Sequence, residues 1–289
     1  MSETSGPAGA YAIPFELDPT IIITGAGALN PVRDVASVET IGVRTWEGVS
    51  ADSVTAGYVP EATAATDASP TLAQPVITTQ QGRAVVKASI ELMQDWSRIQ
   101  QEMARLLADA RNTVDATAFA TGFTNSPVGV LAVGFTGGLS TTQRVLSAAT
   151  NSYAVGDPWL LKAQIPPRFA GNATFAASPG IWDTTYRFVG GNSTEPLQMP
   201  SRGGDMMGRP KIEWSTLTTG TVTGARLMIG GDFATGFKII DRLGMTAEII
   251  PHVFDVTNNM PTGERMIYSY WRTGSAVVAP NALRYLEVK

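Results

Sequence analysis

Few residues of this chain could perform covalent chemistry. There is a single histidine, His252, and there is no cysteine among the 289 residues. Disulfides, thiolate zinc sites and cysteine nucleophiles are therefore excluded, and a serine-type triad would need His252 as its base. His252 lies between Pro251 and Val253 in a strand-like run. A base needs an activated partner, so we predict a core or edge residue, and a hydrolase using His252 remains a remote alternative.

A glycine-rich segment and several aspartates could belong to nucleotide or metal sites. Residues 22–30 begin like a dinucleotide-binding loop, but Asn30 replaces the third glycine and Pro31 follows at once. No G-x-x-x-x-G-K-[ST] loop and no G-x-S-x-G elbow occurs. Asp205 and Asp232 lie in glycine-rich turns, where aspartate serves the backbone, and no carboxylate cluster has metal-ligand spacing. The sequence therefore predicts no catalytic residue, no cofactor and no metal site.

Composition favours a chain whose surface is covered by partners. Charged residues make up 16%, below the usual ~25%, and such a surface resists association poorly. The net charge is −4 and the pI is about 5.1, whereas nucleic-acid binders usually carry a basic patch. No apolar run is long enough to predict a membrane span, and residues 1–9 do not resemble a signal peptide. The length allows one large unit or two smaller ones.

The first third of the chain is unusual. Residues 1–43 read as an extended arm, because four prolines oppose helix formation: Pro7, Pro14, Pro19 and Pro31. Residues 45–82 contain no lysine or arginine, and their acidic residues are Glu47, Asp52, Glu61 and Asp67. Strand-forming residues on both flanks predict a long two-stranded hairpin with an acidic tip. Because long loops in compact domains are usually functional, we prefer this interpretation to a disordered linker.

A long helix should follow the hairpin. Ser97 and Gln100 fit a capping box, and Ser89 is a candidate cap for a short preceding turn. Apolar residues at helical spacing predict one buried stripe over residues 98–118: Ile99, Met103, Leu107, Ala110, Val114 and Ala118. Ion pairs are expected at Arg98/Glu102, Arg105/Asp109 and Arg111/Asp115. Gly122 stands where a C-cap glycine would.

The remaining chain interleaves helix and strand signals. Asp157-Pro158 opens a short helix that should stop at Pro166, and Ser178-Pro179 opens another that should end at Gly190. Strands are predicted at residues 173–176, 211–214, 225–229, 237–240, 245–250, 265–272 and 276–279. Because there is no regular βαβ repetition, we predict an α+β fold.

These segments, in this order, resemble the major capsid proteins of tailed double-stranded-DNA bacteriophages, which have the Hong Kong 97-type fold. Residues 86–95 (VKASIELMQD) look like the beginning of the family's spine helix, and residues 119–131 are similar to the glycine turn after it. Further resemblances lie at residues 169–178, 230–233, 239–244 and 272–283. Each piece is weak alone, and their co-linear agreement carries the resemblance.

The resemblance implies a division of the chain into named parts. These are an N-terminal arm (1–43), an extended loop (44–82), a peripheral domain with the spine helix (83–130), an axial domain (131–232), peripheral strands (233–275) and a C-terminal return to the axial domain (276–289).

The function implied is that of a shell subunit rather than an enzyme. Head-to-tail contacts would form pentamers and hexamers of an icosahedral head that encloses double-stranded DNA without sequence-specific contacts. Implied partners are a separate scaffolding protein, a portal protein and, as an open question, a decoration protein, but no membrane. The expected location is the virion, after assembly in the host cytoplasm. An encapsulin-like nanocompartment shell is the alternative, although the Pro/Gly-rich start argues for a phage arm.

One departure from the family concerns covalent cross-linking. Some members join subunits by an isopeptide bond between a lysine of the extended loop and an asparagine of the peripheral domain. Here the first lysine is Lys87, beyond the loop, so Asn258 and Asn259 have no amine partner there. We therefore predict a non-covalent shell, with Gly82 and Gly122 as candidate hinges for rigid-body rearrangement.

Overall fold

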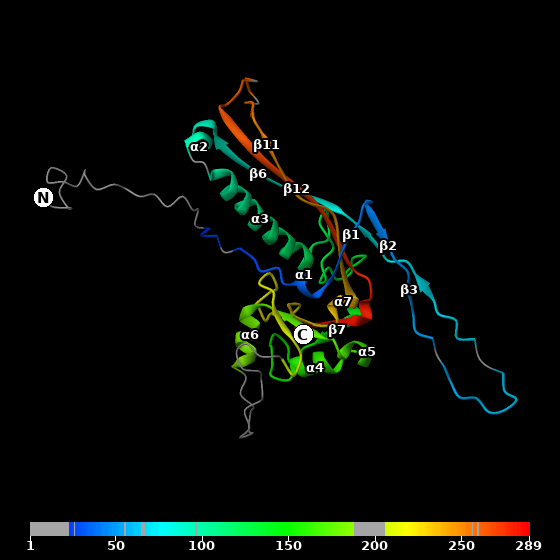
Figure 1. Cartoon of the computed structure of the whole chain (residues 1–289). Coiled ribbons are helices and arrows are strands. Elements are labelled where there is room, and N and C mark those ends of the chain that lie inside the picture. Colours follow the sequence, from blue (N-terminus) through cyan, green and yellow to red (C-terminus); the bar gives the residue numbers. More distant parts are fainter. Residues whose placement is uncertain are drawn as a thin grey trace.

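The computed structural model describes residues 23–187 and 206–289, apart from residues 26, 55, 65, 66, 96, 97, 256 and 259. Within these residues the strands form a four-stranded sheet, a five-stranded sheet and two short two-stranded ladders. Figure 1 shows an elongated sheet with a long helix beside it, a more compact unit below, and a hairpin that projects away from both. Sheets and helices segregate rather than alternate regularly, so the α+β prediction is confirmed.

The four-stranded sheet has the order β1 (Ser37–Thr40), β11 (Phe237–Ile250), β12 (Glu264–Val277) and β6 (Gln80–Ser89). We expected separate short strands in residues 237–250 and 265–279, and this was wrong. β11 and β12 each continue for 14 residues, because register shifts between Asp241 and Thr246 absorb Gly244 as a bulge. The two strands therefore pair along their whole length.

The long helix α3 (Ile99–Thr121) follows a short helix, α2 (Ile90–Asp95). The backbone N–H of Leu92 donates to Ser89 Oγ at 3.1 Å, so this predicted cap is confirmed. Arg98 holds the N-cap position of α3 without a side-chain cap, and Ser97 lies outside the described residues.

The predicted apolar stripe of α3 is correct at Ile99, Met103, Leu107 and Ala118 and wrong in the middle, at Ala110 and Val114. Ile99, Met103 and Leu107 pack with Ile267 of the sheet, but Ala110 and Val114 are exposed. Beyond Val114, residues 115, 116, 118, 119 and 120 are all buried, because the end of α3 contacts a different core. Of the expected ion pairs, Arg111–Asp115 is present at 3.3 Å, while Arg105 lies 3.8 Å from Glu102.

The five-stranded sheet has the order β7 (Arg144–Leu146), β13 (Leu283–Glu287), β10 (Arg226–Gly231), β8 (Thr174–Ala177) and β9 (Lys211–Glu213). The helices α4 (Asp157–Ala163), α5 (Pro167–Ala170) and α6 (Pro179–Tyr186) belong to the same compact unit. The two predicted helix starts are confirmed, α4 ends before Pro166, and the expected end at Gly190 lies outside the described residues. β13 was not predicted.

Two short helices connect the units. α1 (Val32–Val35) contradicts the prediction that prolines keep the arm free of helix, because Pro31 sits at its N-cap, where no backbone N–H is needed. α7 (Phe233–Gly236) leads from β10 into β11. A core cluster joins α1, α3, α7 and both sheets through buried residues such as Val32, Phe119, Phe233 and Tyr285.

The predicted hairpin is present. β2 (Thr45–Glu47) pairs with β5 (Val76–Thr78), and farther out β3 (Ser50–Ala51) pairs with β4 (Leu72–Ala73). Beyond β3 and β4 the chain has no regular secondary structure among its described residues. In the part of the chain that the structure describes, no helix combines the length and apolarity needed to cross a membrane.

Candidate assembly surfaces

The hairpin is the surface that the chain itself leaves most bare. Val49, Leu72 and Tyr58 are among its exposed large side chains, and the exposed fraction of Leu72 is 66%. Its far ladder consists of only two register pairs, Ser50–Ala73 and Ala51–Leu72. A two-stranded ribbon of this kind is marginal in water alone. It can therefore serve as a contact element for another molecule, and Figure 1 shows it directed away from the rest of the chain.

The outer end of the elongated sheet carries a second exposed group. The segment between β11 and β12 presents Phe254 and Met260, which are 58% and 66% exposed, and Leu92 of α2 is also exposed. The backbone N–H of Ile90 donates to the carbonyl of Gly263 at 3.1 Å, which ties α2 to this segment. These exposed apolar side chains make the outer end of the sheet a second candidate surface for contact with another molecule.

The described polar candidates from the sequence lie in two places: His252 and Asn258 in the segment after β11, and Asp232 before α7. His252 is exposed in the segment after β11, so the expectation of a core or edge-strand residue is wrong. Asn258 donates to Asp255 at 3.0 Å in the same segment, while Asn259 and Asp205 lie outside the described residues. Asp232 caps α7 by accepting from the Thr235 N–H at 3.2 Å, as expected of a turn aspartate. The described residues contain no cluster of three or more histidine or acidic residues that could hold a metal ion.

The glycine-rich segment before Asn30 does not build a nucleotide site. It leads into α1, which has only four residues, and then into β1. A dinucleotide loop needs a strand, a tight turn and the N-terminus of a full helix in one βαβ unit. The described part of this segment therefore lacks the helix that would hold a pyrophosphate.

A partly buried ionic cluster joins three distant parts of the sequence. Arg33 of α1 donates to Asp241 of β11 at 2.7 and 3.2 Å and lies 3.4 Å from Asp115 of α3. Arg111 lies 3.3 Å from the same Asp115 carboxylate, and the Arg33 guanidinium stands 5.3 Å from the centre of the Phe119 ring. The cluster fixes α1 between the long helix and the sheet.

The two carboxylates of this cluster shift in opposite directions. Burial raises the pKa of Asp115 above its ordinary value, and the nearby Arg111 and Arg33 offset this only in part. Burial also acts to raise the pKa of Asp241, but the hydrogen bonds and charge of Arg33 outweigh it and hold this pKa below its ordinary value. Asp241 is thus the carboxylate that Arg33 stabilises in its charged form.

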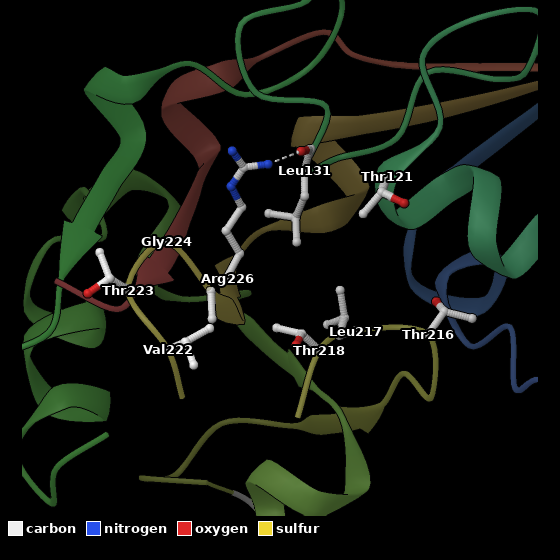
Figure 2. A pocket seen from close by; sticks show the side chains of 10 residues that line it. Thr121, Leu131, Thr216, Leu217, Thr218, Val222, Thr223, Gly224 and Arg226 are labelled. Carbon is white, nitrogen blue, oxygen red and sulfur yellow. Dashed lines mark hydrogen bonds between the residues drawn. The ribbon is translucent and has the colours of Figure 1, made fainter. Parts of the chain in front are cut away.

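One open groove, of about 440 Å³, lies between the end of α3 and the five-stranded sheet. Figure 2 shows its lining, in which threonines and aliphatic side chains surround Arg226. Arg226 donates to the carbonyl of Leu131 at 2.8 Å and to Glu287 at 3.3 Å, and Thr216 donates to the carbonyl of Ala116. These polar groups already bond within the chain, and the lining offers no nucleophile paired with a base.

Comparison with known proteins decides the family. A sequence profile described as the Phage capsid family matches residues 9–288. The chain belongs to the phage capsid family. It is a capsid protein with the Hong Kong 97-type α+β fold, from a family whose members build icosahedral shells.

Solved structures agree with this fold. The chain is similar to the "capsid of native GTA particle computed with C5 symmetry", with a TM-score of 0.82 and 19% identity, covering 100% of this chain and 99% of the other. It is also similar to chains from Gordonia phage Cozz (TM-score 0.65, 16% identity, 98% and 94% covered) and Mycobacterium phage Ogopogo (TM-score 0.68, 11% identity, 98% and 99% covered). No curated protein matches the chain.

Sequence reasoning missed one feature of this capsid protein's surface. Phe123 and Phe135 stack with ring centres 4.4 Å apart, and both remain half-exposed. They lie on either side of the turn after α3, at Gly122-Phe123 and Gly134-Phe135. Each phenylalanine directly follows a glycine, and this was the available signal, although only Phe123 lies in the predicted turn at residues 119–131.

Proposed function

We propose that copies of this capsid protein associate head to tail into pentamers and hexamers, which close into the icosahedral head around double-stranded DNA. The observation that carries the proposal is the hairpin, whose large apolar side chains stand bare along an element that projects from the body. A heterologous contact, in which this hairpin meets a different patch of the next subunit, closes into a ring.

The proposed domain arrangement follows the two sheets. The peripheral domain comprises residues 83–130 and 233–275, and the axial domain comprises residues 131–232 with the C-terminal return at 276–289. The arm (1–43) and extended loop (44–82) reach toward neighbours. The four-stranded sheet, with α3 on one face, and the five-stranded compact unit support this division.

We further propose that the acidic hairpin meets basic side chains of its neighbour. The face of the four-stranded sheet opposite α3 carries Arg83 and Lys87 of β6, and both are exposed, although Lys87 also lies 3.9 Å from the Glu264 carboxylate of its own chain. Glu47, Asp52 and Glu61 of the hairpin are likewise exposed, and no lysine or arginine neutralises them within residues 45–82. Complementary charge of this kind steers association and sets the register between partners.

Other proposed partners follow from the role of a head subunit. They are a separate scaffolding protein, a portal protein and packaged DNA held without sequence-specific contacts, with a decoration protein as a further candidate. The chain acts in the virion after assembly in the host cytoplasm and is not an enzyme. No observation favours the nanocompartment shell or the hydrolase alternative.

Negative-stain electron microscopy of the purified chain, alone and with a candidate scaffolding protein, tests the proposal. Closed polyhedra, tubes or rings of five or six subunits are expected. A monodisperse monomer under every condition would overturn the shell function. Small empty shells from the chain alone would instead favour the nanocompartment.

Boiled denaturing gels of the assembled particles test the absence of cross-links. We expect a single band near 30.6 kDa, because the extended loop has no lysine to form an isopeptide bond. Ladders at multiples of this mass would show that the shell is covalent.

A further inference from the structure

The root of the hairpin differs from the rest of it, because it is locked to the body. Thr79 closes the two strands: its backbone N–H and its hydroxyl donate to the carbonyl of Arg44 at 3.0 and 2.9 Å. At the same place the chain crosses β12 above Gly274. A Cβ added to Gly274 would lie 2.7 Å from the carbonyl oxygen of Thr78, so only glycine lets the hairpin cross so closely.

An apolar contact holds the crossing in place. Ile77 is 1% exposed and packs against Ile240 and Ala276, on the sheet face that does not belong to the main core. Ile41 and Trp46 pack against the same group. Buried aliphatic side chains thus hold the root of the hairpin on the sheet, whereas the described residues of its outer part belong to no such cluster.

The Trp46 ring adds a directional contact. Lys238 of β11 places its Nζ 4.4 Å from the centre of this ring and 2.6 Å from the Glu39 carboxylate. The ring folds back over Gly48, where a Cβ would lie 2.3 Å from the ring. Glu39, Trp46 and Lys238, which we name the bracket, therefore join β1, the hairpin and β11. Because Lys238 is only 18% exposed, its attraction to the ring is less screened than at an open surface.

We propose that the bracket is a positioning device, which fixes the direction in which the hairpin leaves the body before any neighbour arrives. This proposal rests on the proposed function, since the partner it serves is a second copy of the chain. A hairpin already held in its bound direction loses less conformational freedom on association, and this raises affinity without adding a contact to the partner. The bracket residues act through the hairpin and need not touch the neighbour.

Distance measurement on the unassembled subunit tests the proposal directly. The chain has no cysteine, so Ala51→Cys in β3 and Ala104→Cys in α3, both exposed, would carry the only two spin labels. Pulsed electron paramagnetic resonance on dilute labelled protein mixed with unlabelled protein then reports the distribution of distances between the two labels, whose width measures how far the hairpin moves relative to the body. We expect one narrow distance distribution for the parent, a wide one for Lys238→Met, and a narrow one for Lys238→Arg, which keeps the cation.

A matched control exists on the compact unit. Lys162 lies 5.6 Å from the centre of the Trp159 ring, so Lys162→Met removes a similar cation–ring contact far from the hairpin in sequence. This variant should leave the distance distribution narrow. Glu39→Gln, at a half-exposed site, is the second bracket variant and is used if circular dichroism shows that Lys238→Met does not fold.

Assembly provides the second measurement. The protein concentration at half-maximal assembly, followed by light scattering, should rise about three- to tenfold for Lys238→Met and return toward the parent value for Lys238→Arg. A wide distribution in the parent, or an unchanged one in both bracket variants, would overturn the proposal. If the parent forms no shells, the proposed function fails, but the distance measurement still decides the role of the bracket.

Discussion

The two sheets of this capsid protein differ in how completely the chain covers them. In the five-stranded sheet every residue of β8 is buried. The consecutive residues Phe175 and Ala176 point to opposite faces of the sheet and belong to two different cores. In the outer half of the four-stranded sheet, Val86 and Ala88 of β6 face the α3 side, whereas Val85 is 47% exposed on the opposite face.

This difference indicates which surfaces determine the stability of the subunit and which determine the assembly of the shell. A sheet that is buried on both faces forms its core within one chain. Substitutions in it should therefore change the free energy of unfolding of the isolated subunit. A sheet and hairpin left bare on one side gain their remaining burial only from neighbours. Substitutions there should leave the free energy of unfolding of the subunit almost unchanged but should alter assembly of the shell.

Phe175→Ala should have the largest effect on the subunit. Phe175 is fully buried in β8, and its ring fills the space above Gly230. Removing it should lower the free energy of unfolding by about 3–5 kcal/mol, measured by urea unfolding with circular dichroism. Val85→Ala, on the bare face, should change it by less than about 0.5 kcal/mol. Equal losses in the two variants would break the comparison.

Asp241→Asn should have an intermediate effect. It deprives Arg33 of its closest carboxylate, and we expect a loss of about 1–3 kcal/mol near neutral pH in urea unfolding. Asp115→Asn should cost less, because burial already disfavours the charged form of Asp115 and raises its pKa. A larger loss for Asp115→Asn would show that Asp115, not Asp241, is the main partner of Arg33.

The pH dependence of these variants has a defined sign. The pKa of Asp241 in the folded chain lies below its ordinary value of 3.8, so its charge stabilises the fold above pH 3.8. This contribution is lost as the pH falls through the lowered pKa. The difference between the parent and Asp241→Asn should therefore shrink below pH 3.8. A difference that grows in acid would contradict the assignment.

Local patterns in the sequence predicted much of this fold. Spacing between neighbouring residues, which a sequence displays, predicted the hairpin, most of the α3 stripe, the cap at Ser89, the helix start at Asp157 and most of the strand runs. The prediction failed at Ala110 and Val114 and missed the burial of residues 115, 116, 119 and 120, because burial there depends on a core that includes α1, which lies about 80 residues earlier in the chain. Periodicity along one helix does not reveal where the surrounding core changes.

Contacts between distant segments could not be predicted. The cluster of Arg33, Asp115 and Asp241 joins residues that only the folded chain brings together. The sequence placed Gly274 between two predicted strands, and it did not reveal that the hairpin crosses closely above this residue. The sequence predicted the absence of a catalytic site from composition, because a missing residue type needs no knowledge of the fold.

Leu72→Asn in the hairpin should leave the subunit almost unchanged. Leu72 is 66% exposed, so the free energy of unfolding should shift by less than about 0.5 kcal/mol. The concentration at half-maximal assembly should nevertheless rise, because the variant weakens an apolar contact with the neighbour. Val222→Asn, equally exposed on the compact unit, is the matched control and should raise this concentration less. The reverse order would show that assembly depends on the compact unit instead.

His252→Ala should have the smallest effect of all. The imidazole is exposed beyond the end of β11 and supports no core, so unfolding in urea should match the parent within about 0.5 kcal/mol. Shells of normal appearance by negative stain are also expected, since the apolar residues Phe254 and Met260, not His252, offer contact area at this end. Loss of assembly in this variant would place a polar contact at the outer end of the sheet. The outer end of the sheet would then be a second surface that recognises the neighbouring subunit, independent of the hairpin.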